Sequence, residues 1–178
     1  MSEAAAFAAW LGGAILVLAD GRRGLAVGLA LMAAGLGGVA YAAGEQLTGA
    51  ALLAGGVVAA ALRWRSGPEG WGLMQPGSTP RIVLTVVIGL VALYFAASLA
   101  SGDGAAVRFA PMACIALAGA RLLQGAERGA ALTAASGLVL ALGAGSVLGS
   151  SGSLPAAVVA AVIATGTSAL PAAEPHGA

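Results

Sequence analysis

The apolar positions of this sequence fall into seven long runs, separated by polar breaks. The runs cover approximately residues 4–19, 25–43, 47–62, 82–100, 107–123, 130–148 and 155–170. A transmembrane helix needs about 17–25 predominantly apolar residues, so the first, third and seventh runs are marginal unless they extend into their flanks. The pattern predicts an all-α integral membrane protein, a bundle of about seven transmembrane helices forming one domain over residues 1–178.

The longest polar break, residues 63–81, has the sequence RWRSGPEGWGLMQPGSTPR and is predicted to be a cytoplasmic loop. Its arginines and tryptophans are of the types enriched at protein interfaces, and its prolines restrict the backbone. The same residues suit a linker that lies on anionic lipid, so both alternatives stay open. The candidate contact residues for a partner protein or for lipid are Arg63, Trp64, Arg65, Trp71 and Arg81.

The arginines alternate between the breaks in a way that predicts the orientation of the chain. The first, third and fifth breaks contain seven of the eight arginines, and the other three breaks contain only Arg108. Positive residues close to helix ends favour the cytoplasmic side. The N-terminus is therefore predicted to lie outside and the C-terminus inside.

Composition supports a membrane location. Apolar residues make up 60% of the chain and charged residues 8%, compared with roughly 45–50% and about 25% in soluble domains. The first ten residues carry Glu3 and no basic residue, so the first apolar run is expected to be a retained helix rather than a signal peptide. We expect a multi-pass protein of a cell membrane, the bacterial inner (plasma) membrane in particular.

Small residues recur at every fourth position in several of the predicted helices. The chain has 47 alanines and 29 glycines, which allow neighbouring helices to approach closely. Similar ladders occur in the runs 130–148 and 155–170. The residues predicted to pack helix against helix are Ala26, Ala30, Ala34, Gly38 and Ala42 in the second run, with Gly137, Ala141 and Gly145 in the sixth.

A weak internal similarity relates the two halves of the chain. LGGAILVLADGRRGLA (11–26) resembles LAGARLLQGAERGAAL (117–132), and both segments are predicted to cross from outside to inside. This similarity favours a parallel repeat of three helices, one linker helix and three more helices. A sequence so rich in alanine, glycine and leucine also produces such similarity by chance.

The side chains needed for several common chemistries are missing. The chain has no lysine for a Schiff base, and its one histidine, His176, lies close to the C-terminus. Cys114 lies in an apolar run and is expected to be a packed core residue. The scattered arginines form no continuous basic face for nucleic acid. We therefore expect no enzymatic activity, no metal site and no nucleic acid, and no cofactor can be named.

Two further positions are candidates for polar contacts. Glu45 and Gln46, at an outer helix end, are suited to a cation or a polar solute, although such a pair more often caps a helix or faces water. Arg121 lies about one turn inside the fifth run. Its guanidinium is expected to extend to the cytoplasmic surface without a partner, the alternative being an anionic lipid or the carboxylate of a partner protein.

Two functions fit these observations. In the first, the chain is a non-catalytic accessory or scaffold subunit, packed among other membrane-protein subunits and lipid in a larger complex. In the second, it is a small transporter or membrane-embedded binding component for an apolar or neutral solute. The hydroxyl groups expected to line the site in that case belong to Thr85, Ser98, Ser136, Ser146, Thr165 and Thr167.

Overall fold

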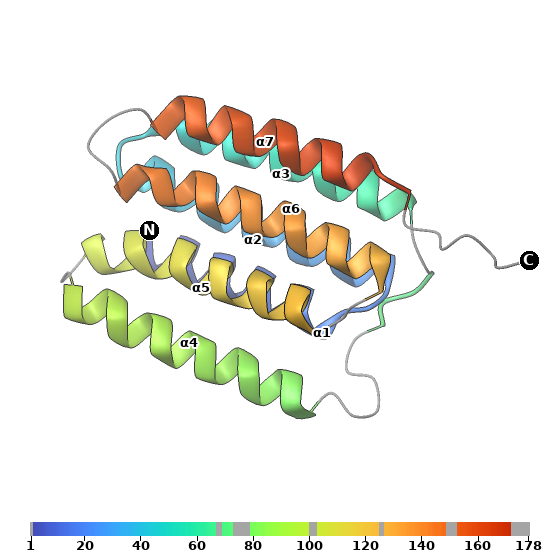
Figure 1. Cartoon of the computed structure of the whole chain (residues 1–178). Coiled ribbons are helices and arrows are strands. Elements are labelled where there is room, and N and C mark those ends of the chain that lie inside the picture. Colours follow the sequence, from blue (N-terminus) through green and yellow to red (C-terminus); the bar gives the residue numbers. More distant parts are fainter. Residues whose placement is uncertain are drawn as a thin grey trace, which may run out of the picture.

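The computed structural model describes residues 2–66, 69–72, 79–99, 103–124, 127–148 and 153–171. These residues form seven α-helices and one short 3-10 turn (Figure 1). The helices are α1 (Ser2–Leu18), α2 (Arg22–Ala42), α3 (Gln46–Arg65), α4 (Thr79–Leu99), α5 (Asp103–Leu123), α6 (Arg128–Gly145) and α7 (Ser153–Ala169), and the turn η1 (Ser146–Leu148) follows α6. The predicted all-α architecture with seven helices is confirmed.

Five of the described helices are long and apolar enough to cross a membrane. They are α2, α3, Thr79–Ser98 of α4, Gly104–Leu123 of α5, and α6 together with η1. The apolar helices α1 and α7 have 17 residues each, or about 26 Å at 1.5 Å per residue, somewhat less than a hydrocarbon core of about 30 Å. The chain is thus a multi-pass integral membrane protein by helix length and composition.

Local sequence accounts for several helix ends. Pro80 and Pro155 lie in the first turns of α4 and α7, where a missing backbone N–H removes no helical hydrogen bond. Between α2 and α3 the chain reverses at Gly44, whose φ of 91° is in the left-handed region that glycine adopts easily. Helix α3 continues to Arg65. The predicted loop 63–81 is therefore too long at both ends, because residues 63–65 belong to α3 and residues 79–81 belong to α4.

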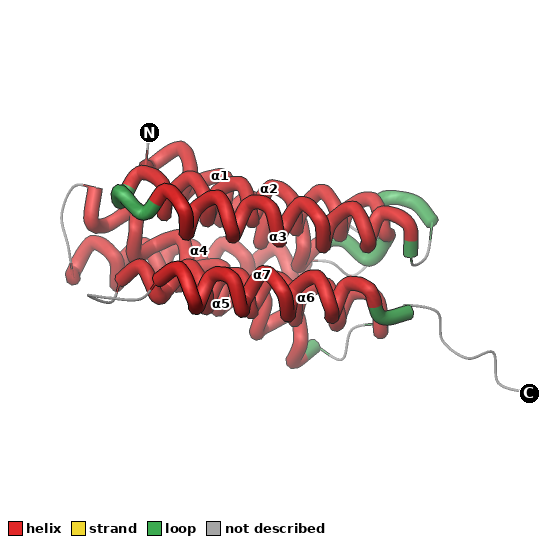
Figure 2. The backbone as a smooth tube through the Cα atoms, turned by 90° about the horizontal axis from the view of Figure 1, so that it is seen from above, coloured by secondary structure: helices red, strands yellow, loops and turns green. Residues whose placement is uncertain are grey.

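The helices form two layers of three, and α4 lies at one edge. One layer contains α1, α2 and α3, and the other contains α5, α6 and α7; α1 packs against α5, α2 against α6 and α3 against α7 (Figures 1 and 2). Helix α4 packs mainly on α5. Only three of its described side chains, Thr85, Ala92 and Ala96, are buried.

The core forms where backbones approach closely, because glycine and alanine leave room for them. A methyl group on Gly12 or Gly35 would overlap the facing backbone at Met32 or Ala9, so α1 and α2 touch along these residues. A methyl group on Gly55 would likewise overlap Ala161, which joins α3 to α7. Leucines such as Leu16, Leu29 and Leu36 fill the rest of the core.

Candidate functional site

The clearest polar constellation lies at one end of the bundle, here called the arginine-rich end: the last residues of α1, α3, α5 and α7 and the first residues of α2, α4 and α6. Asp20, between α1 and α2, is its centre. Arg81 Nη1 donates to Asp20 Oδ2 at 2.9 Å. Arg121 Nη2 donates to Asp20 Oδ1 and, at 3.1 Å, to the carbonyl oxygen of Ala19. One carboxylate therefore joins three separate parts of the chain.

The two arginines determine the charge state of this carboxylate. Burial by itself raises the pKa of Asp20, but the hydrogen bonds and positive charges of Arg121 and Arg81 lower it more. The net pKa lies below the ordinary value of an aspartate. Asp20 is therefore ionised at neutral pH, and Arg121, which is fully buried, needs it as a counter-ion.

This contact corrects the sequence interpretation of Arg121. Its guanidinium was expected to extend to the surface without a partner, but it turns inward and pairs with Asp20. The two residues are 101 positions apart. Because the sequence shows no spacing between them that implies contact, only the packing of α1 against α5 brings them together.

Residues 69–72 lie against the turn between α1 and α2. Asp20 N–H donates to the carbonyl oxygen of Gly72 at 3.1 Å, and Arg23 N–H donates to that of Gly70 at 3.2 Å. Arg22 Nη2 pairs with Glu69 at 2.9 Å. A methyl group on Gly21 would overlap the backbone of Gly70, so the contact is close. This part of the polar segment is bound to its own chain.

The remaining candidate contact residues of that segment divide into exposed and buried ones. Trp64, Arg65 and Trp71 are exposed. Arg63 is completely buried, and its Nε, Nη1 and Nη2 have no hydrogen-bond partner within the described part of the chain. The sequence analysis assigned residue 63 to a loop, and for that reason it did not predict that Arg63 is buried.

A second polar cluster lies at the opposite end of the bundle. Ser153 Oγ, at the start of α7, donates to Glu45 Oε2 at 2.7 Å. Thr48 Oγ1 lies 2.9 Å from Ser153 Oγ and 3.3 Å from Glu45 Oε2. Gln46 is exposed and is not one of the residues in this cluster. Glu45 thus joins the start of α3 to the start of α7.

A third cluster joins α6 to α7 inside the bundle. Ser136 Oγ lies 2.7 Å from Thr167 Oγ1 and 2.9 Å from Ser168 Oγ, and it donates to backbone oxygens of Leu132 and Ala164. Sequence reasoning named Ser136 and Thr167 as site hydroxyls, and it named Ser168 only as one of the small residues that recur at every fourth position in the seventh run.

Four of the other predicted hydroxyl groups bond close by in sequence. Thr85, Ser98, Thr165 and Ser146 donate to carbonyl oxygens three or four residues earlier. Ser146 also donates to the carbonyl oxygen of Ser153 at 3.4 Å, which ties the turn η1 to the start of α7. Among these six predicted hydroxyls, the structure pairs Ser136 with Thr167 by a direct hydrogen bond.

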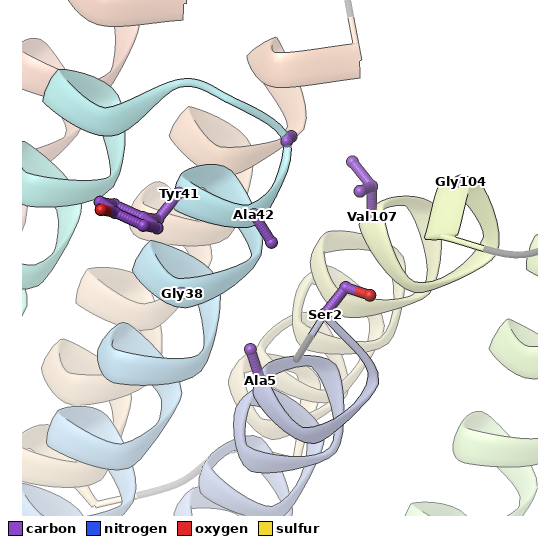
Figure 3. Close-up of a pocket in the computed structure, with 8 residues that line it drawn as sticks. Ser2, Ala5, Gly38, Tyr41, Ala42, Gly104 and Val107 are labelled. Carbon is purple, nitrogen blue, oxygen red and sulfur yellow. The ribbon is translucent and has the colours of Figure 1, made fainter.

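A pocket of about 740 Å³ lies at the end of the bundle opposite the arginine-rich end, between α1, α2 and α5 (Figure 3). Small side chains such as Ala5 and Ala42 form much of its lining, with Val107 on the α5 side. Tyr41, at its edge, is 60% exposed, and its ring extends away from Ser2 and Val107. The pocket is of a size that accepts small molecules, but few polar groups converge on it.

The predicted packing residues lie in different environments. On α2, Ala26 is buried, Ala30 and Gly38 are partly buried, and Ala34 and Ala42 are exposed. The closest approach of α2 to α1 is at Gly28 and Gly35, and a methyl group on the predicted Gly38 would also lie 3.0 Å from the Cβ of Ala5 on α1. On α6, Gly137 and Ala141 are buried, whereas a methyl group on Gly145 would meet open space.

The described residues contain no group of three or more histidine, cysteine, aspartate or glutamate side chains that could hold a metal ion. Cys114 is buried and its Sγ donates to the carbonyl oxygen of Ala9 at 3.4 Å. His176 lies outside the described residues.

Comparison with known proteins finds no matching family model, no matching curated protein and no matching solved structure.

Proposed function

We propose that this chain is a non-catalytic accessory or scaffold subunit of a larger membrane complex, with α4 as its main contact to another subunit. The observation that carries this proposal is the exposure of α4. Bulky apolar side chains cover most of its circumference, including Val83, Leu90, Leu93, Tyr94 and Phe95, which are 52–70% exposed. The rest of the bundle packs in two layers without it.

Two apolar grooves beside α4 support this assignment. One, of about 300 Å³, lies between α4 and α5 and is lined by residues that include Val91 and Met112. The other, of about 280 Å³, lies where α4 meets α1 and α5 and includes Trp10 and Phe109. Grooves of this kind accept the side chains of a neighbouring helix, and dispersion contacts drive helix association in lipid.

The proposed orientation has the arginine-rich end in the cytoplasm. The alternating helices bring Arg22, Arg63, Arg81, Arg121 and Arg128 to the same end of the bundle, and Arg108 lies in the first turns of α5 at the other end. Positive residues favour the cytoplasmic side, so this distribution supports an outside N-terminus, an inside C-terminus and insertion in a bacterial inner membrane.

The two layers also support the proposed repeat of three, one and three helices. Each helix of the first layer packs on the helix four places later in the chain, α1 on α5, α2 on α6 and α3 on α7 (Figure 2). Both helices of each pair run in the same direction, as a parallel repeat requires. Helix α4 is then the linker, which accounts for its place outside both layers.

Site-specific crosslinking tests the scaffold proposal. A photoreactive amino acid replaces Tyr94 on α4, and in a matched control it replaces Val162 on α7, which is exposed to a similar degree at 66%. We expect a protein adduct in native membranes at position 94 and only lipid adducts at position 162. Lipid adducts alone at both positions, with no stoichiometric protein copurifying in mild detergent, would refute the proposal.

A second function, binding or transport of an apolar or neutral solute, is favoured by the pocket between α1, α2 and α5. We propose it as the alternative if no partner is found. Uptake of the solute by liposomes containing the isolated chain should then be lost in Ala42→Trp, because the indole would fill the pocket. The control Ala34→Trp changes an exposed residue of the same helix outside that lining and should keep uptake.

A further inference from the structure

Arg63 is the one described arginine with its entire guanidinium both buried and unpartnered. Its side chain has 0% exposure, and all three nitrogens lack a hydrogen-bond partner among the described residues. An ionised group in this position carries a large free-energy penalty unless a counter-charge compensates it. Arginine stays protonated in proteins. A negative group is therefore required at this position.

Helix geometry locates the side chain. Arg63 follows Gly56 by seven residues, or two turns, and lies on the same face of α3. A methyl group on Gly56 would overlap Ala33 of α2 and would lie 3.4 Å from Leu140 of α6. Arg63 therefore faces the space between α2 and α6, two turns closer to the arginine-rich end.

The helix contacts at Gly55 and Gly56 also identify the residues that lie level with Arg63 on the neighbouring helices. Helices α2 and α6 run antiparallel to α3, so two turns along α3 correspond to Ala26 on α2 and Thr133 on α6, both buried. Helix α7 runs parallel to α3, and the contact of Gly55 with Ala161 places Arg63 level with the end of α7, beside Ser168. The three residues placed at this level by helix register are one alanine and two residues with hydroxyl groups.

The carboxylates described at this end either form ion pairs with other arginines or are exposed. Asp20 pairs with Arg81 and Arg121, and Glu69 pairs with Arg22. Glu127 is exposed in front of α6. The described residues of this end carry seven arginines and three carboxylates, so positive charge is in excess by four. Among the described residues of this end, the excess positive charge has no compensating carboxylate.

We propose that Arg63 is the centre of a binding site for one phosphate-type oxyanion, between α2, α3, α6 and α7 at the arginine-rich end. The planar guanidinium offers paired N–H donors that match a phosphate group. The hydroxyls of Thr133 and Ser168 supply further donors by rotation away from their present hydrogen bonds with Gly129 O and Ser136 Oγ. Arg63 is two residues from the end of α3, so the anion enters from the aqueous end.

This site does not depend on the scaffold proposal, because it involves the interior of the chain and not α4. The phosphate group has two natural sources: the headgroup of an anionic lipid in the cytoplasmic leaflet, or phosphate or a phosphorylated solute in the cytoplasm. Both present the same oxyanion to Arg63, and the experiment separates them.

Thermal melting of the full chain in nanodiscs is the test. In phosphatidylcholine nanodiscs, sodium phosphate is titrated against sodium chloride at equal ionic strength. In a second arm, phosphatidylglycerol replaces part of the phosphatidylcholine without free phosphate. We expect a saturable rise of the melting temperature, in the first arm for a soluble oxyanion and in the second for a lipid headgroup.

The variants decide whether Arg63 is responsible. Arg63→Met should lose the response, with apparent affinity weakened by about tenfold or more, as expected for removal of charge-assisted hydrogen bonds. In phosphatidylcholine nanodiscs without phosphate, the melting temperature of Arg63→Met should equal or exceed that of the native chain, which would show that the variant folds. Arg65→Gln, an exposed neighbour, should respond like the native chain. Equal responses of Arg63→Met and the native chain, or no native response in either arm, would overturn the proposal.

Discussion

Asp20 and Arg121 connect the two layers of the bundle at the arginine-rich end. Asp20 follows α1, and Arg121 belongs to the last turn of α5, the helix that packs on α1 in the other layer. Arg121 is fully buried and Asp20 is mostly buried, so the guanidinium depends on this carboxylate rather than on water for compensation of its charge. The same carboxylate accepts from Arg81, and thereby holds the first turn of α4 against the layers.

Replacing Asp20 with asparagine should destabilise the fold strongly. The substitution keeps the size of the side chain but leaves the buried guanidinium of Arg121 without a counter-ion. Removing one partner of a buried ion pair costs about 3–5 kcal/mol. Unfolding by titration with a denaturing detergent, followed by circular dichroism, measures the loss. The double variant Asp20→Asn with Arg121→Met should be more stable than Asp20→Asn alone, because it removes the orphaned charge.

Glu69→Gln is the matched control for that measurement. Glu69 pairs with Arg22 at the same end of the bundle, but its side chain is 85% exposed. Exposed pairs contribute only about 0–1 kcal/mol. Similar losses in Asp20→Asn and Glu69→Gln would contradict the central role of Asp20.

The stability of the native chain should fall at acidic pH because of Asp20. Its pKa in the folded chain lies below the ordinary value of 3.8. A lowered carboxyl pKa gives stability that is complete above the unfolded value and is lost as the pH falls through the folded value. The melting temperature should therefore be insensitive to this group above about pH 5 and decline below about pH 4. Asp20→Asn should show a smaller decline over that range, and an equal decline would exclude Asp20 as its source.

The fold class was readable from the sequence because it depends on a strong one-dimensional signal. Apolar runs of membrane length, separated by polar breaks, predicted the seven helices, and the extension of the marginal runs brought α3 to 20 residues. The end of α3 was misplaced because Arg63 and Arg65 are typical of a loop. The burial of Arg63 depends on its facing α2 and α6, and hydropathy along one helix contains no information about such a face.

The ion pairs and the packing face were not predictable for a related reason. Asp20 and Arg121 meet only after α1 and α5 are placed in facing layers. In a chain so rich in alanine and glycine, ladders at intervals of four residues occur on several faces of α2. The sequence named the ladder that includes Ala34, which is exposed, whereas Gly35 on the next face contacts α1.

Gly35 should therefore tolerate a larger side chain far less well than Ala34 does. A methyl group on Gly35 would overlap the backbone of Ala9, whereas Ala34 is exposed. Overpacking of a tight contact costs about 1–3 kcal/mol. We expect Gly35→Leu to lower the melting temperature in detergent well below that of Ala34→Leu. Equal tolerance at the two positions would mean that α1 and α2 are not in contact there.

The orientation in the membrane can be tested by cysteine labelling at positions that the structure shows to be accessible. Gln46, exposed at the start of α3, serves for the end opposite the arginine-rich end. Glu69, at 85% side-chain exposure, serves for the arginine-rich end. The native Cys114 is buried and is replaced by alanine in both variants. Because arginine-rich ends stay in the cytoplasm, a membrane-impermeant maleimide should label Gln46→Cys in intact cells and Glu69→Cys only after permeabilisation. Labelling of Glu69→Cys in intact cells, with Gln46→Cys protected, would reverse the proposed orientation and would place the proposed oxyanion site on the outer side of the membrane.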